Sequence, residues 1–95
     1  MNKNGYVYIL ASRRNGTLYI GVTSNPVRRI SEHKSDIQKG FTEKNKVHYL
    51  VYIEKFDRIT DAMAREKQLK HWNRAWKIRI IEEMNPEWND ISSEL

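Results

Sequence analysis

The stretch that determines the fold runs from Tyr6 to His33 and reads YVYILASRRNGTLYIGVTSNPVRRISEH. Two runs rich in β-branched and aromatic residues lie on either side of Asn15-Gly16, a pair typical of the tight turn between antiparallel strands. We therefore expect strands over about residues 5–11 and 17–23, joined as a hairpin.

A helix is predicted to follow the hairpin. Asn25 is a preferred N-cap residue and Pro26 suits the first helical position, so the helix should begin at Pro26 and extend to about Asp36. Arg29 and His33 lie one turn apart on this helix, and the helical wheel places both beside its apolar stripe.

The pairing of the two strands is expected to place Tyr8 and Tyr19 on the same face of the sheet. In an antiparallel hairpin with an even loop, opposed residues have numbers with an odd sum, and side chains alternate along each strand. Because the numbers of Tyr8 and Tyr19 have an odd sum, both phenols should emerge on one face. Two phenols, the Arg29 guanidinium and the His33 imidazole can therefore converge.

The remainder of the chain is predicted to contain a strand over residues 47–56 and helices over 61–72 and 74–84. Thr60 is the expected N-cap of the helix over 61–72, and Asn85-Pro86 ends the helix over 74–84. Trp88 is expected to hold the acidic tail against the body. These elements predict an α+β fold. It has a three-stranded antiparallel sheet with flanking helices, in the order ββαβαα. We expect a single domain whose core spans about residues 5–88.

Composition limits the class of protein. The chain has 95 residues, a net charge of +5 and no cysteine, and its pI is about 9.6. A disulfide scaffold and a zinc site built from cysteines are therefore excluded. No apolar run is long enough to span a bilayer, so we expect a cytoplasmic protein without a membrane partner. The positive charge favours nucleic acid as the partner, although a basic domain with no such partner remains an alternative.

Glu66 is unusual because it falls on an otherwise apolar face of its predicted helix. Ala62, Leu69 and Asn73 share that face, within about 60° on a helical wheel. A carboxylate in such a stripe is costly unless it is paired or coordinated. It can form an ion pair with Lys70 one turn later, which the spacing alone favours. It can instead bind a hard divalent cation together with water and phosphate oxygens.

Each of these signals is weak alone, because exposed helix residues and packed strand tyrosines are common. Their order resembles the GIY-YIG nuclease superfamily, and most closely its small stand-alone bacterial members labelled as endonucleases. The resemblance rests on Tyr6-Val7-Tyr8, Tyr19-Ile20-Gly21, Arg29 with His33, Glu66, the stretch Ala64–Lys70 and the ending Asn85–Trp88. The second motif is matched in full. In the first motif, Gly-Ile-Tyr, this chain has Tyr6-Val7-Tyr8. Tyr6 therefore stands at the glycine position, and Gly5 lies one residue before it.

The resemblance implies metal-dependent hydrolysis of phosphodiester bonds in DNA. Glu66 would hold a single Mg²⁺ or Mn²⁺, and Arg29 would stabilise the anionic transition state. Tyr8 and Tyr19 would orient and deprotonate the attacking water, with the choice between them left open. His33 would take the phenol proton or hold a phosphate. The family also has a later asparagine near the site, for which Asn73 and Asn85 are both candidates.

Substrate contacts are predicted from basic residues that alternate with aromatic ones between Arg65 and Arg79. The candidates for phosphate contact are Arg28, Lys70, Arg74 and Lys77. Trp76 is expected to be a core residue. The polar segment 35–46 is expected to be a loop, and its Gly40-Phe41-Thr42 is a further candidate contact.

The chain carries no recognisable specificity domain, which favours recognition of DNA shape, such as nicks, branches or flaps in repair or recombination. Self-association or a partner protein could also supply specificity. Two other functions compete with the endonuclease. One is a non-catalytic nucleic-acid-binding module, and the other is an interaction subunit of a repair complex. The combination of Tyr8, Tyr19, Arg29 and Glu66 favours the enzyme over both.

Overall fold

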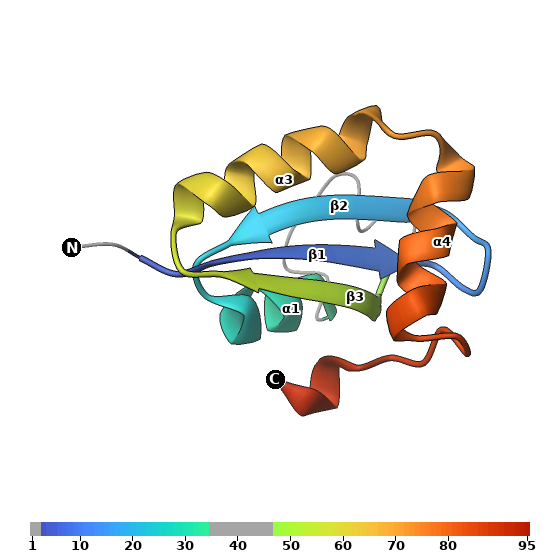
Figure 1. Cartoon of the computed structure of the whole chain (residues 1–95). Helices are drawn as coiled ribbons and strands as arrows, with labels where there is room; N and C mark the ends of the chain where they lie inside the picture. The colour runs from blue at the N-terminus through green and yellow to red at the C-terminus, as the bar shows by residue number, and fades with distance from the viewer. Residues whose placement is uncertain (1–2, 35–46) are drawn as a thin grey trace.

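The computed structural model describes residues 3–34 and 47–95 of the chain. In these ranges the predicted order of elements is confirmed, with three antiparallel strands in the spatial order β2-β1-β3 (Figure 1). The elements are β1 (Gly5–Ala11), β2 (Leu18–Thr23), α1 (Pro26–Lys34), β3 (Tyr49–Phe56), α3 (Ile59–His71), α4 (Arg74–Met84) and a 3₁₀ turn, η1 (Ser92–Glu94).

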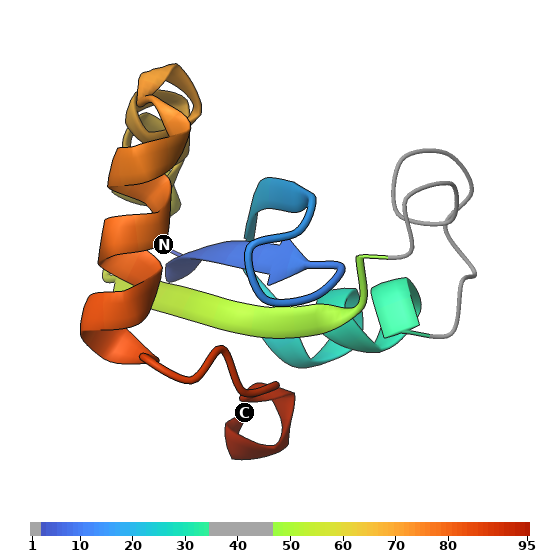
Figure 2. The same ribbon diagram turned by 90° about the vertical axis from the view of Figure 1, so that its right-hand side faces the viewer.

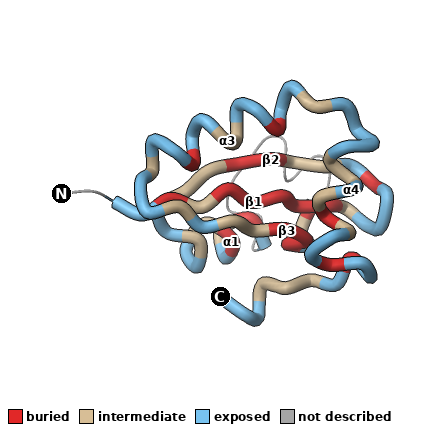
Figure 3. The backbone as a smooth tube through the Cα atoms, viewed as in Figure 1, coloured by how far each residue is buried: buried red, intermediate tan, exposed pale blue. Residues whose placement is uncertain are grey.

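The sheet separates two layers of helix. Figure 2 shows α1 on one face of the sheet and α3 with α4 on the other. Figure 3 shows that buried positions are concentrated in the three strands, above all in the central strand β1. Val7, Ile9 and Ala11 pack toward α3 and α4, whereas Tyr8 and Leu10 pack toward α1. The alternation of side chains along β1 therefore supplies both cores.

The hairpin has the predicted turn and pairing. Asn15 adopts a positive φ of 60°, a conformation that asparagine tolerates in tight turns. Tyr8 is paired with Gly21 and Leu10 with Tyr19, so opposed residues do have odd sums. Tyr8 and Tyr19 consequently lie on one face, as the sequence predicts.

Helix starts are explained by their caps in two of three cases. The Arg28 backbone N–H donates to Asn25 Oδ1 at 3.2 Å, which confirms the predicted cap of α1. The Trp76 N–H donates likewise to Asn73 Oδ1 at 2.9 Å and starts α4. The prediction for Thr60 is wrong, because α3 already begins at Ile59. The Ile59 N–H donates to the Lys3 carbonyl at 2.8 Å, so a backbone contact occupies this end of the helix.

The two tryptophans near the C-terminal end have opposite environments. Trp88 is buried and its indole N–H donates to Glu82 Oε2 at 2.7 Å, which confirms that it holds the tail. Trp76 is 54% exposed, so its predicted place in the core is wrong. Its ring meets Trp72 edge-on at 5.6 Å between centroids, on the outside of α4.

Some sequence predictions fall outside the described residues. These are the loop over residues 35–46, its Gly40-Phe41-Thr42 contact, and the end of the first helix at Asp36. Among the residues that the structure does describe, no helix combines the length and the apolar composition that crossing a membrane requires.

Candidate active site

Tyr8 is the centre of a group of four functional side chains on the α1 face of the sheet. It stands on β1 opposite Gly21 of β2. A Cβ atom on Gly21 would lie 2.4 Å from the Tyr8 hydroxyl oxygen, which is inside van der Waals contact. The phenol therefore lies directly over the glycine backbone. This contact gives a physical reason for a glycine after Tyr19-Ile20.

Arg29 approaches Tyr8 from the first turns of α1. Its Nε–H donates to the Tyr8 hydroxyl at 3.4 Å, and its Nη1 forms an ion pair with Glu32 at 3.4 Å. Burial raises the pKa of Tyr8 to about 12, and the hydrogen bond from Arg29 opposes this only in part. The same hydrogen bond raises the pKa of Arg29. At neutral pH the pair is a neutral phenol and a permanent cation.

His33 lies on the other side of the Tyr8 hydroxyl, 3.2 Å from Nε2 to oxygen. The imidazole is 1% exposed, so it belongs to the core and does not merely border it as the helical wheel predicted. Burial, followed by the charge of Arg29, lowers its pKa to about 4. Its Nδ1 has no hydrogen-bond partner within the described residues. His33 is therefore a neutral, buried proton acceptor or donor beside Tyr8.

Tyr19 completes the group, which we call the tyrosine cluster: Tyr8, Tyr19, Arg29 and His33. The Tyr19 ring lies 6.3 Å from the Tyr8 ring and 5.3 Å from the His33 ring, measured between centroids. The predicted convergence of these four side chains is confirmed. Tyr19 is half-buried whereas Tyr8 is 1% exposed, so Tyr19 is the phenol that solvent and ligands can reach.

Glu66 lies outside the tyrosine cluster, on α3 and thus on the other face of the sheet. Ala62 and Leu69 on either side of it are fully buried, while its own side chain is 21% exposed. Its carboxylate forms an ion pair with Lys70 at 3.4 Å, which is the pairing that the spacing favoured. The costly position of Glu66 is therefore compensated within its own helix.

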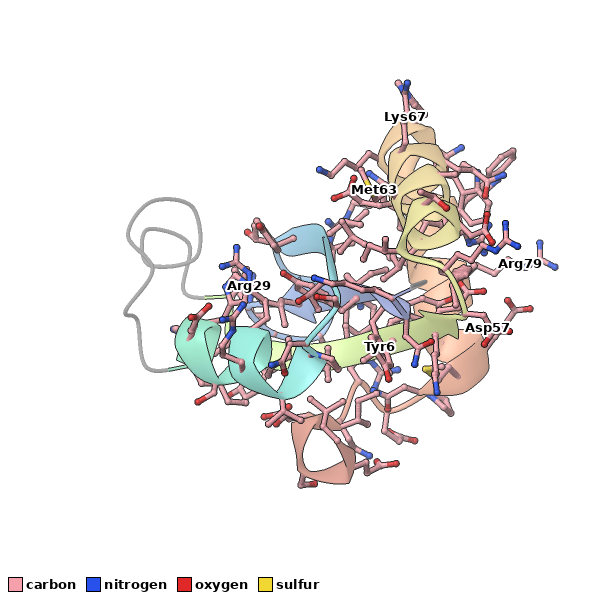
Figure 4. The ribbon with its side chains drawn as sticks, turned by 90° about the vertical axis from the view of Figure 1, so that its left-hand side faces the viewer. Tyr6, Arg29, Asp57, Met63, Lys67 and Arg79 are labelled. Atoms are coloured by element: carbon pink, nitrogen blue, oxygen red, sulfur yellow. The ribbon has the colours of Figure 1, made fainter. Side chains whose placement is uncertain are left out.

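The rotation of α3 directs Glu66 toward the β2 edge of the sheet. Arg65 and Glu66 lie on opposite sides of the line from Ala62 to Leu69. Arg65 Nε donates to Glu54 of β3 at 3.1 Å, so the Glu66 side of the helix faces β2, the strand that carries Tyr19. In Figure 4, Met63 points from this side of α3 toward the side of the molecule where Arg29 lies.

Glu66 suits one kind of metal ion. Among the described residues, no three His, Cys, Asp or Glu side chains are grouped as ligands could be. A single partly exposed carboxylate therefore fits a cation that keeps its water ligands and also binds phosphate oxygens. Mg²⁺ binds in this way, and Mn²⁺ prefers similar ligands.

The predicted phosphate contacts do not form one helical stripe. The α3 helix ends at His71, whereas Arg74 and Lys77 belong to the first turn of α4. Lys70 pairs with Glu66, and Arg74 Nη2 donates to the carbonyl oxygens of Asn15 and Gly16 at 2.6 Å each. Arg74 thus has a structural role at the hairpin. Arg28 is exposed on α1, and its contact with DNA stays a prediction.

Neither candidate asparagine is a free side chain. Asn73 caps α4 through its Oδ1. Asn85 is buried, and its Nδ2 donates to the carbonyls of Val51 at 3.2 Å and Asn89 at 2.7 Å. Both residues therefore have local roles in ending or starting a helix. The ion pair from Arg29 to Glu32 was not predicted, although its three-residue spacing on a helix was a readable signal.

The sequence is similar to that of known proteins. The family model for the GIY-YIG catalytic domain matches residues 4–79. A UPF0213 protein of Natronomonas pharaonis is 38% identical over 81 residues, which cover 85% of this chain and 94% of that protein. A UPF0213 protein of Syntrophus aciditrophicus is 39% identical over 88 residues, which cover 92% and 98%.

A solved structure agrees with this relationship. The solution NMR structure of a UPF0213 protein from Bacillus halodurans matches with a TM-score of 0.52 and 33% identity, covering 83% of each chain. The matched region of the family model contains both tyrosines, Arg29, His33 and Glu66. The chain therefore belongs to the GIY-YIG domain family.

Proposed function

We propose that this protein is a metal-dependent DNA endonuclease that hydrolyses phosphodiester bonds. The tyrosine cluster is the observation that carries the proposal. The Arg29 guanidinium and the His33 imidazole both contact the Tyr8 hydroxyl, and the Tyr19 ring lies 6.3 Å from the Tyr8 ring. Membership of the GIY-YIG family supports the same reaction class. The fold alone would not, since one fold can serve many functions.

Arg29 is the proposed phosphate-binding group of the site. Its side chain is 29% exposed, so it can reach a bound ligand while Tyr8 fixes its direction. Guanidinium has five N–H donors in a rigid plane, and Tyr8, Glu32 and Tyr19 all lie within reach of them. A fixed cation of this kind stabilises the negative charge that grows on phosphate oxygens during hydrolysis.

The two tyrosines differ in burial, which suggests different tasks. Tyr19 is half-buried and is the phenol proposed to contact the attacking water. Tyr8 is buried with a pKa of about 12, so it keeps its proton at neutral pH and serves first to orient Arg29 and His33. His33 Nε2, 3.2 Å away, is the acceptor if Tyr8 releases that proton during the reaction.

Glu66 is the residue proposed to hold the divalent cation, Mg²⁺ or Mn²⁺. When bound, such a cation would neutralise charge on the leaving oxygen of the phosphodiester. The protein's own contribution is a carboxylate on the β2 side of α3. Lys70 holds it through the ion pair, and the cation would have to compete with that pair.

The proposed substrate is DNA with a nick, branch or flap, in the cytoplasm and in the context of repair or recombination. The net charge of +5 supports a polyanion. Arg28, Lys70 and Lys77 are the proposed phosphate contacts outside the tyrosine cluster. A protein partner or a homodimer is proposed to add to the specificity.

The test is cleavage of end-labelled nicked, flapped, branched and linear DNA with Mg²⁺, Mn²⁺ or EDTA. We expect cleavage only with metal, and its loss in Glu66→Gln. The control is Glu83→Gln, which removes an exposed carboxylate from α4 and should cleave normally. Metal-dependent cleavage that is undiminished in Glu66→Gln would contradict the metal role.

A non-catalytic DNA-binding module is the second candidate. The ion pair between Glu66 and Lys70 favours it, because a carboxylate already paired has less need of a metal. This candidate predicts salt-sensitive binding of DNA without any nicking. The interaction subunit of a repair complex predicts instead no DNA affinity and a stable protein partner.

A further inference from the structure

The C-terminal segment after α4 contacts the α1 side of the molecule. The family match ends at residue 79, so this segment lies beyond it. Figure 2 shows it leaving α4, passing below β3 and ending near α1. The Ile91 N–H donates to the Leu50 carbonyl at 2.8 Å, and the Ile91 side chain packs against the core that contains Tyr8 and Ile30.

Asp90 connects this segment to the end of α1. One carboxylate oxygen accepts from the Leu50 N–H at 3.2 Å and from the Ser92 N–H at 3.1 Å. The other oxygen forms an ion pair with Lys34 Nζ. Lys34 is the last residue of α1 and directly follows His33. Burial alone would raise the pKa of Asp90, but these hydrogen bonds, first that of Lys34, keep it lowered.

A second set of contacts surrounds the same end of the helix. Lys34 Nζ also donates to the His48 carbonyl at 2.9 Å, and His48 Nδ1 lies 3.1 Å from the His33 carbonyl oxygen. The described part of α1 has nine residues, and helices in folded proteins take most of their stability from tertiary contacts. Its orientation is therefore set at this end by Lys34, and through Lys34 by Asp90.

We propose that Asp90 is a positioning residue for the tyrosine cluster. It holds the end of α1 against β3 so that His33 and Arg29 stay in reach of the Tyr8 hydroxyl. The catalytic part of this inference rests on the proposed function, whereas the positioning part is a statement about the folded protein.

The titration of His33 in NMR spectra measures the positioning directly. Its pKa is lowered to about 4 mainly by burial, so a loosened α1 should let it rise toward the ordinary value of about 6.5. In Asp90→Asn we expect the pKa of His33 to rise by about one unit. Loss of a nearby negative charge would by itself lower the pKa of an imidazole. A rise therefore reports altered burial and cannot come from the missing charge.

Matched variants separate this role from general damage. Glu94→Gln removes an exposed carboxylate from the same segment and should leave the His33 titration unchanged. Lys34→Gln breaks the same ion pair from the other side, but loss of its positive charge would by itself raise the pKa of an imidazole. Asp90→Asn is therefore the variant that isolates a change in burial. The signal of His33 is assigned with His33→Gln.

Cleavage assays add the functional readout. We expect Asp90→Asn to lower kcat roughly tenfold to a hundredfold with little change in KM, because misplaced catalytic groups slow the reaction more than binding. An unchanged His33 titration in Asp90→Asn would overturn the positioning role. Absence of cleavage by the wild type would overturn the proposed function only, since the titration needs no substrate.

Discussion

The side chains buried on the two faces of the sheet differ in polarity. Toward α3 and α4 the core is entirely apolar at its centre, where Val7, Ile9, Leu69 and Ile81 are fully buried. Toward α1 the core contains Tyr8 and the imidazole of His33, whose Nδ1 has no partner within the described residues. Burying polar groups costs free energy that apolar groups do not lose. The α3 and α4 face therefore contributes more to stability than the α1 face, which buries polar groups at a cost.

This contrast predicts that mutations on the two faces affect different measurements. Leu69→Ala, on the apolar face, should lower the free energy of unfolding by about 2–5 kcal/mol, because it leaves a cavity in a packed core. Urea unfolding followed by circular dichroism measures the change. Met63→Ala is the control, since Met63 lies on the same helix and is 53% exposed. An equal loss in the control would contradict the proposed division.

Arg29→Ala, on the polar face, should lower kcat/KM for DNA cleavage by roughly 10²–10³-fold, the usual effect of removing one donor to a transition-state anion. The unfolding free energy should change little, because the side chain is 29% exposed. Arg58→Ala is the control, because Arg58 is an exposed arginine for which no role in the site is proposed. Similar losses in both variants would mean that general charge, and not a fixed guanidinium, drives the reaction.

His33 should make stability depend on pH. Its pKa is about 4 in the folded state and about 6.5 when unfolded, so the unfolded chain takes up the proton first as pH falls. Stability is therefore complete above about pH 6.5, declines toward pH 4 and then levels off. Between pH 7 and pH 5 the expected loss is about 2 kcal/mol, measured by urea unfolding. In His33→Gln this part of the pH dependence should disappear, and its persistence would show that another group causes it.

Trp76→Ser should have the smallest effect. The side chain is 54% exposed on the outside of α4, so the unfolding free energy should change by no more than about 0.5 kcal/mol. Trp88→Ser provides the contrast, because Trp88 is buried and bonded to Glu82. A large loss for Trp76 would indicate that its contact with Trp72 contributes more than exposure suggests.

Predictions from sequence succeeded where neighbours along the chain decide the outcome. The hairpin, the cap at Asn25, the break at Asn73 and the shared face of Tyr8 and Tyr19 all follow from periodicity and connectivity over a few residues. The family resemblance indicated the tyrosine cluster and Glu66, because it rests on the order of these residues along the chain. The end of α3 was predicted at residue 72, one residue beyond its observed end at His71.

Predictions failed or stayed open where distant segments meet. Periodicity placed His33 beside the apolar stripe, but in the folded protein its imidazole contacts Tyr8 and Tyr19 and is only 1% exposed. Trp76 lies on the apolar band predicted for its helix, yet it is 54% exposed. The pair of Lys34 and Asp90 joins residues 56 positions apart, and no local pattern indicates such a contact.

Local periodicity, caps and turn residues were thus sufficient to assign the strands, the helices and the side chains that share a face. Tertiary packing alone decided which of those side chains lost contact with water, which partner each one found, and how α3 directs Glu66 toward β2. The physical reason is that backbone geometry sets the direction of a side chain within its own element. Burial and pairing depend instead on what the rest of the chain brings opposite to it.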